Sequence, residues 1–275
     1  QSQAEIALRL TRIYLNDTPP LYAKANRLLE LIVHMTKAVV AKLKRNSERS
    51  ESSISQMVQE IKKWNDLSNQ ALRLQIIALA GQGKPSAAQS LVESLETAGT
   101  DELLSVLNGI SQINLDLTPE VRRELGMLQL KSAEKLASRR DSLKPQQANR
   151  LDLCLAEAYL AIDQPIRALE YYQTLLKHSP KDASLIRQVA LLLERCGTKQ
   201  CLQQASQKWQ SLITAEKPGT LPWLDIRLHL IQTLFGSGNE AEAKKLLGVT
   251  RLLYPDLGNP DMKSRYDEMQ SRLKK

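Results

Sequence analysis

The segment from Asn149 to Asp182 constrains the fold of this chain more than any other, because two apolar periodicities and a turn follow one another within it. Apolar residues recur at three- and four-residue spacing over 151–162 and again over 166–176. This spacing predicts two amphipathic helices. Pro165 lies between them and suits the first turn of the second helix, where its missing N–H costs no hydrogen bond. The segment therefore predicts an antiparallel pair of helices joined by a short turn.

The same segment resembles the tetratricopeptide repeat, a helix-turn-helix unit of about 34 residues. The residues that fall on the family's pattern in register are Leu155, Ala156, Tyr159, Ala168, Tyr172 and Pro180. Two residues depart from it, since Asp152 stands where the pattern has Trp and Leu175 where a small residue is usual. The resemblance implies an all-α fold, in which antiparallel helix pairs stack into a right-handed superhelical solenoid. It also implies a non-catalytic scaffold that binds other proteins.

Weaker copies of the pattern predict how the chain is organised. We expect tetratricopeptide-like repeats at 149–182, 183–218 and 220–256, followed by a C-terminal capping helix at 259–275. Residues 1–148 are expected to form a more diverged helical-repeat region, which contains a long basic helix at 21–45. Capping helices of such arrays need one apolar stripe and a polar outer face, and the last segment has both.

Residues 53–82 can be read in two ways. Their helical periodicity has no Gly or Pro before Gly81, which allows one long helix that returns along the preceding one. Asn65, Asp66, Ser68 and Asn69 are weak helix formers, and they favour two helices that meet there. We prefer the break.

The composition fits stacked helix pairs better than a β fold. The chain has 275 residues, of which 42% are hydrophobic and only 4% aromatic, and thin layers between helix pairs need few aromatic side chains. We find no alternating β pattern, no apolar run long enough to span a membrane and no signal-peptide pattern. The chain begins with Gln1 rather than Met, and we interpret it as a cut or processed form.

The cysteines and histidines give no metal-site spacing. Cys154, Cys196 and Cys201 are odd in number, which favours free thiols in a reducing compartment such as the cytoplasm. Cys196 and Cys201 lack the second pair of ligands that a zinc site needs, so we expect two buried thiols there. The sequence predicts no metal and no cofactor.

No motif in the chain predicts catalysis. Residues 81–86 partly match a phosphate-binding loop, but Ala78 stands in place of the first glycine, Pro85 in place of the hydroxyl residue, and no strand precedes the loop. Nucleophile-elbow and zinc-protease motifs are absent. We therefore expect the protein not to be an enzyme.

The family resemblance also implies a partner groove lined by the first helices of successive repeats. Carried over to this sequence, its residues are Arg150, Leu153, Cys154, Glu157, Leu160, Arg187, Gln188, Leu191, Leu228, His229, Gln232 and Phe235. Members that clamp acidic chaperone tails have Lys and Asn where Leu153 and Glu157 stand, which argues against that ligand. We expect the groove to bind a peptide or helix of another protein.

Two alternative functions stay open. The formal net charge of +8 is concentrated partly in a basic patch, which consists of Lys24, Arg27, Lys37, Lys42, Lys44 and Arg45. Basic helices can bind nucleic acid by counterion release, although no aromatic residues are interleaved here for base stacking. The chain could instead be a regulatory or localising module of a larger multidomain protein.

Overall fold

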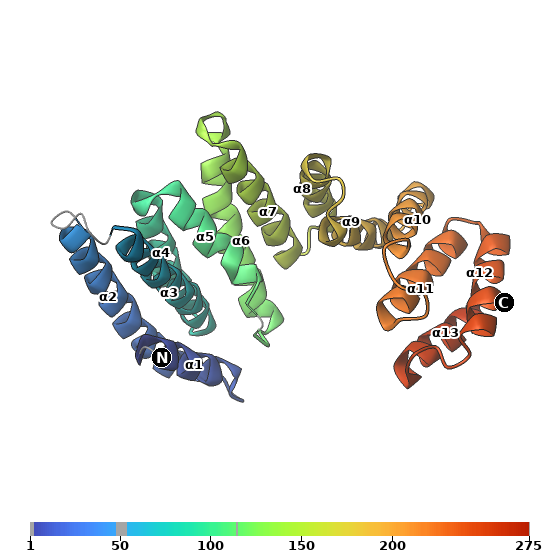
Figure 1. Cartoon of the computed structure of the whole chain (residues 1–275), viewed down its shortest axis with the longest axis horizontal. Coiled ribbons are helices and arrows are strands. Elements are labelled where there is room, and N and C mark those ends of the chain that lie inside the picture. The colour runs from blue at the N-terminus through green and yellow to red at the C-terminus, as the bar shows by residue number, and fades with distance from the viewer. Residues whose placement is uncertain (1–2, 48–53, 114, 275) are drawn as a thin grey trace. The chain divides into compact units, whose positions relative to one another are not determined.

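The computed structural model describes residues 3–47, 54–113 and 115–274, and every regular element in these residues is a helix (Figure 1). The expected all-α class is therefore confirmed. None of the described helices is long and apolar enough to cross a membrane. The chain divides into two compact units, Gln1–Asp163 and Gln164–Lys275, which we call the N-terminal and C-terminal units. The division falls inside the segment 149–182, between its two helices.

Consecutive helices pack against one another within each unit, as in a helical repeat. The N-terminal unit contains α1 (Gln3–Asn16), α2 (Tyr22–Ser47), α3 (Ile54–Gly81), α4 (Pro85–Ala98), α5 (Thr100–Ser111), α6 (Pro119–Ala137), a 3₁₀ turn η2 (Arg140–Ser142) and α7 (Pro145–Ala161). The C-terminal unit contains α8 (Pro165–His178), α9 (Ala183–Cys196), α10 (Lys199–Ile213), α11 (Leu221–Gly236), α12 (Glu240–Leu253) and α13 (Pro260–Leu273).

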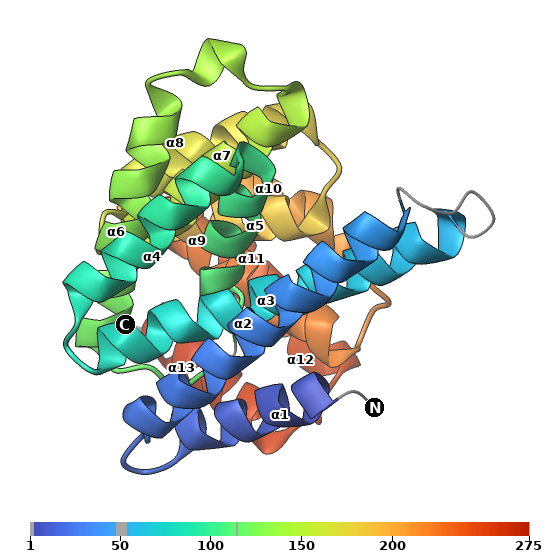
Figure 2. The ribbon, with the colours of Figure 1, turned by 90° about the vertical axis from the view of Figure 1, so that its left-hand side faces the viewer.

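Helix α3 runs without interruption, so the expected break near residue 65 is wrong. Figure 2 shows α3 beside α2 along most of its length. Asn65 and Asp66 point to solvent, whereas Leu67 and Ser68 are buried. A weak helix former costs only about 0.5 kcal/mol, which is less than burying one large apolar side chain contributes. Packing against α2 therefore outweighs the local preference.

Helix boundaries follow the proline and cap positions. Pro165 and Pro119 are the first residues of α8 and α6. Thr118 precedes α6, and its side chain accepts a hydrogen bond from the Val121 N–H at 3.4 Å. Asp182 caps α9 in the same way, accepting from two backbone N–H groups. Such caps satisfy N–H groups that have no partner within the helix.

Asp152, which replaces the Trp of the repeat pattern, is almost fully buried in α7 at 1% exposure. Its two carboxylate oxygens accept hydrogen bonds from Arg140 at 2.5 and 2.7 Å. A buried carboxylate needs such a bidentate partner to offset the loss of hydration. The pair ties η2 to α7 at a position that the repeat normally fills with an indole.

The predicted capping helix is confirmed as α13. Met262, Tyr266 and Met269 form its buried stripe, and most of the remaining residues are exposed. The Tyr266 hydroxyl donates to the Leu224 carbonyl of α11 at 2.9 Å, so the buried polar end of the ring has a partner. This helix packs its apolar stripe against α11 and α12 at the end of the C-terminal unit.

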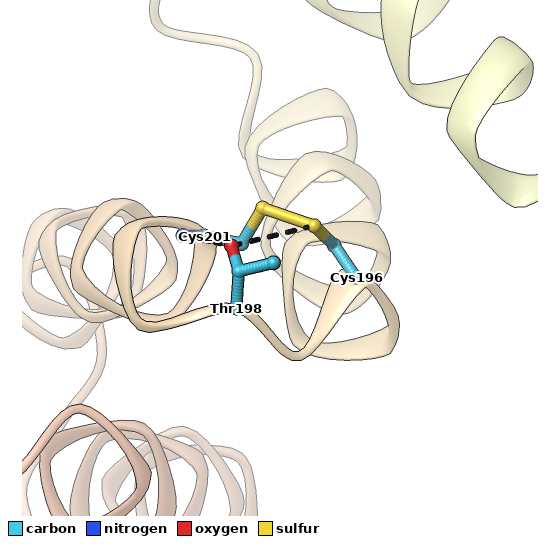
Figure 3. The surroundings of a disulfide bond; sticks show 3 residues. All are labelled: Cys196, Thr198 and Cys201. Atoms are coloured by element: carbon cyan, nitrogen blue, oxygen red, sulfur yellow. Dashed lines mark hydrogen bonds between the residues drawn. A yellow bond between two sulfur atoms is a disulfide. The ribbon is translucent and has the colours of Figure 1, made fainter.

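Cys196 and Cys201 form a disulfide, which corrects the expectation of two buried free thiols. Figure 3 shows it bridging the turn between α9 and α10, where Thr198 caps α10 by accepting from the Cys201 N–H at 3.1 Å. The turn brings the two Cα atoms to 6.2 Å, within the range of disulfides. Both cysteines are half-buried, and Cys154 is free and buried. The cysteines therefore no longer favour a reducing compartment.

A substitution at Ala168 tests how tightly α8 packs in the C-terminal unit. The Ala168 side chain is fully buried in α8. We expect Ala168→Leu to overpack this site and destabilise the unit by roughly 1–3 kcal/mol, lowering the melting temperature measured by circular dichroism. Ile166→Ala on the same helix is the control, because Ile166 is 65% exposed and its change should stay within about 0.5 kcal/mol. Equal melting curves for Ala168→Leu and wild type would show that α8 does not pack through this residue.

Candidate binding faces

Helices α9, α11 and α13 place charged and polar side chains on one face of the C-terminal unit. Arg187, Leu191 and Glu194 recur on α9 at i, i+4 and i+7. Asp225, His229 and Gln232 recur at the same spacing on α11. This spacing puts each set on one side of its helix. We call the C-terminal face the surface formed by Arg187, Gln188, Leu191, Glu194, Asp225, His229, Gln232 and Arg265.

Asp225 joins the three helices of this face. It accepts from Arg187 of α9 at 3.1 Å and from Arg265 of α13 at 2.9 Å. Partial burial on its own would raise the pKa of Asp225, but the hydrogen bonds from Arg265 and Arg187, together with His229, hold it below its usual range. The carboxylate therefore stays charged at neutral pH and fixes both guanidinium groups.

His229 is held on three sides. Its ring stacks on Trp209 with centroids 4.6 Å apart, and its Nδ1 lies 3.1 Å from both carboxylate oxygens of Glu194. Its Nε2 lies 3.9 Å from Asp225. Trp209 is fully buried and donates its indole N–H to Glu194 at 2.6 Å, while Arg187 lies over the same ring. The imidazole is thus fixed in place while remaining partly exposed at 17%.

Six of the seven candidate residues in the C-terminal unit are half-buried and reach the surface. They are Arg187, Gln188, Leu191, His229, Gln232 and Phe235. The structure brings Arg187 and His229 into the network around Asp225 and Glu194, and Phe235 lies under Arg272 of α13 at 5.7 Å. Leu228 is a correction. It is fully buried, because α11 is covered on several sides, and it belongs to the core.

Four residues of this network were missed by sequence reasoning, namely Glu194, Trp209, Asp225 and Arg265. Two of them carry a signal in the sequence, since Asp225 lies four residues before His229 and Glu194 lies seven after Arg187. Each such pair shares a helix face. Trp209 and Arg265 come from other helices, and only the packing shows that they belong here.

The remaining candidates lie on α7 of the N-terminal unit. Arg150 donates to the Asp101 carboxylate and to the Asp101 backbone carbonyl of α5, both at 3.2 Å. Asn108 of α5 donates to the Arg150 carbonyl at 2.9 Å. Leu153 and Leu160 are half-buried. These contacts join α5 and α7 side by side and leave a mixed polar and apolar surface on α7.

Glu157 and Cys154 are the remaining two candidates on α7, and both are turned toward the protein interior. Burial raises the pKa of Glu157 to about 7, although a hydrogen bond from Ser111 opposes the shift. Its Oε2 atom is buried and has no hydrogen-bond partner. Cys154 is fully buried, so it is a core residue and cannot line a groove as expected. Burial, and secondarily the charge of Glu157, raises the pKa of the Cys154 thiol.

The six residues of the expected basic patch, Lys24, Arg27, Lys37, Lys42, Lys44 and Arg45, are all exposed on α2. They flank the outer surface of a helix whose only acidic residue is Glu30. The patch is therefore a solvent-exposed charged surface. In the described part of the chain, no three His, Cys, Asp or Glu residues are grouped as a metal site would require.

Comparison with known proteins identifies no family. No protein-family model matches the chain, and no curated protein matches it in sequence. Among solved structures, Pseudomonas aeruginosa PilF aligns with 89% of this chain and 97% of its own at 14% identity, with a TM-score of 0.43.

Glu157 makes the stability of the N-terminal unit depend on pH. Because its pKa rises from 4.5 to about 7 on folding, the folded state keeps a proton that the unfolded chain releases in this range. We expect the free energy of unfolding to fall as pH rises from 4.5 to 7, by at most roughly 3 kcal/mol from this residue, and to level off above.

Glu157→Gln should remove this contribution, which urea unfolding at a series of pH values would measure. The matched control is Glu60→Gln, which neutralises an exposed carboxyl group on α3 of the same unit. A pH dependence that is the same in Glu157→Gln and in wild type would show that Glu157 is ionised in the folded protein at neutral pH.

Proposed function

We propose that this protein is a non-catalytic interaction scaffold of the tetratricopeptide type, and that its C-terminal face binds a peptide or helix of a partner protein. The observation that supports this most is the network centred on Asp225, which connects α9, α11 and α13 while Arg187, Asp225 and Arg265 stay partly exposed. Side chains held in this way lose little conformational entropy when a partner binds.

The chemistry of the face suits a polypeptide ligand. Arg187 and Arg265 present N–H donors, Glu194 presents carboxylate oxygens, and Leu191 adds an apolar contact. A peptide backbone offers both donors and acceptors, and its side chains offer charges of either sign. Interfaces of stable complexes combine such polar groups with buried apolar contacts. A binding role is also compatible with a regulatory or localising module of a larger protein.

Nucleic-acid binding through α2 is the second candidate, and the exposed basic patch is the observation that favours it. Binding to phosphates falls steeply with salt, because counterions are released on association. Contact with a mixed polar and apolar face depends less on salt. The two candidates therefore predict different behaviour in one capture experiment.

The experiment captures partners from a nuclease-treated lysate with wild-type protein and with Gln188→Glu/Gln232→Glu. Both glutamines are half-buried on the C-terminal face, and neither side chain has a hydrogen-bond partner among the described residues, so the fold should tolerate the change. We expect a discrete protein to bind wild type at low and high salt and to be depleted about tenfold or more by the variant.

The matched control is Gln203→Glu/Gln210→Glu, which adds the same charge at exposed positions of α10. It should capture the partner as wild type does. Equal capture by both variants would place the binding site elsewhere. Material that is captured only when nuclease is left out, and that high salt removes, would assign the function to α2 instead.

A further inference from the structure

A groove of about 680 Å³ lies between α1 and α3 in the N-terminal unit, outside the faces described above. Arg9 and Arg12 of α1 and Lys62 and Lys63 of α3 line it. Arg9 and Arg12 are three residues apart and share a face of α1, while the adjacent Lys62 and Lys63 both reach the groove from α3. The groove is thus a concave surface with four positive groups along its two sides.

Within the described residues, most of this positive charge has no ion-pair partner. Lys63 lies 3.6 Å from Glu5, but Arg9, Arg12 and Lys62 form no ion pair among the residues that the structure describes. All three are exposed. Unpaired cations of one sign around a groove attract anionic ligands and raise their association rate.

Apolar residues accompany the charges. Leu8 and Leu67 are buried at the groove lining. On the outer side of α1, Ile6, Leu10 and Ile13 recur at i, i+4 and i+7 and are 56%, 39% and 63% exposed. Single exposed apolar residues are ordinary, but three in one helical stripe form a patch that a partner can cover. A ligand for this region therefore needs acidic and apolar groups together.

We propose that the α1–α3 groove binds an acidic amphipathic segment of a partner protein. Carboxylates of the segment pair with Arg9, Arg12 and Lys62, and its apolar side chains cover the stripe on α1. The site uses none of the residues of the C-terminal face, so it goes beyond the proposed function and can stand or fall separately from it.

The groove suits a polypeptide better than the other anionic surfaces. Glu5 and Asp66 are interleaved with the cations, and their charges oppose a continuous phosphate backbone or an anionic bilayer. A flat bilayer also cannot enter the concave space between two helices. None of the described lining residues is aromatic, so bases would find no stacking partner. A peptide can place its carboxylates beside the cations and avoid the two acids.

The test measures fluorescence anisotropy of a labelled peptide that repeats Glu-Glu-Leu against the full chain. A peptide that repeats Gln-Gln-Leu, anionic phosphatidylserine vesicles and single-stranded oligothymidylate are the comparison ligands. We expect the acidic peptide to bind and the neutral peptide to bind weakly. Arg9→Gln/Arg12→Gln should weaken binding of the acidic peptide about tenfold, because two charge-assisted contacts are lost.

The matched control removes two exposed arginines of α6 and the turn after it, Arg123→Gln/Arg139→Gln, and should bind the acidic peptide as wild type does. Lys62→Gln reports from the opposite side of the groove and should also weaken binding. If Arg123→Gln/Arg139→Gln weakened binding of the acidic peptide as much as Arg9→Gln/Arg12→Gln does, the peptide would be bound through the net charge of the protein. That result would overturn the proposal. So would tighter binding of vesicles or oligothymidylate that Arg9→Gln/Arg12→Gln abolishes, because the groove would then serve another class of ligand.

Discussion

Close approach of neighbouring helices through small residues is the constraint on which this structure depends. A Cβ atom at Gly126 of α6 would lie only 2.5 Å from the Cβ of Ala161 in α7, so the two backbones meet there without a side chain between them. Ala168, Ala205 and Ala243 are fully buried in the same way in the C-terminal unit. Helices packed this closely bury thin apolar layers, which explains a stable fold with few aromatic residues.

Thin layers leave part of most helices at the surface. The carboxyl groups there differ in whether hydrogen bonds and ion pairs compensate for their loss of hydration. Asp225 is partly buried, yet two arginines fix it as a charged carboxylate. Glu157 is buried without enough partners, so its pKa rises to about 7. Both outcomes follow from the cost of removing a charge from water. A well-paired network is a rigid binding surface, whereas a poorly paired carboxyl group makes stability depend on pH.

The sequence predicted the helices well where the signal is local. Pro165, Thr118 and the apolar stripe of α13 mark boundaries and faces that the structure confirms. It failed where distant contacts decide. Packing against α2 keeps α3 continuous through Asn65. The disulfide between Cys196 and Cys201 is local, with a sequence separation of 5, but it depends on the geometry of the turn between α9 and α10, which the spacing of the cysteines alone does not show.

The candidate site was predicted only in part, for the same reason. Leu228 shares a helix stripe with half-buried residues that reach the surface, but neighbouring helices cover it completely, and Cys154 is buried likewise.

Hydrogen–deuterium exchange with and without the captured partner tests most directly whether the C-terminal face binds that partner. If the C-terminal face binds the partner, amide exchange is expected to be slower in α9, α11 and α13 of the complex and unchanged in α2. Slower exchange in α2, with unchanged exchange in α9, α11 and α13, would contradict binding at the C-terminal face.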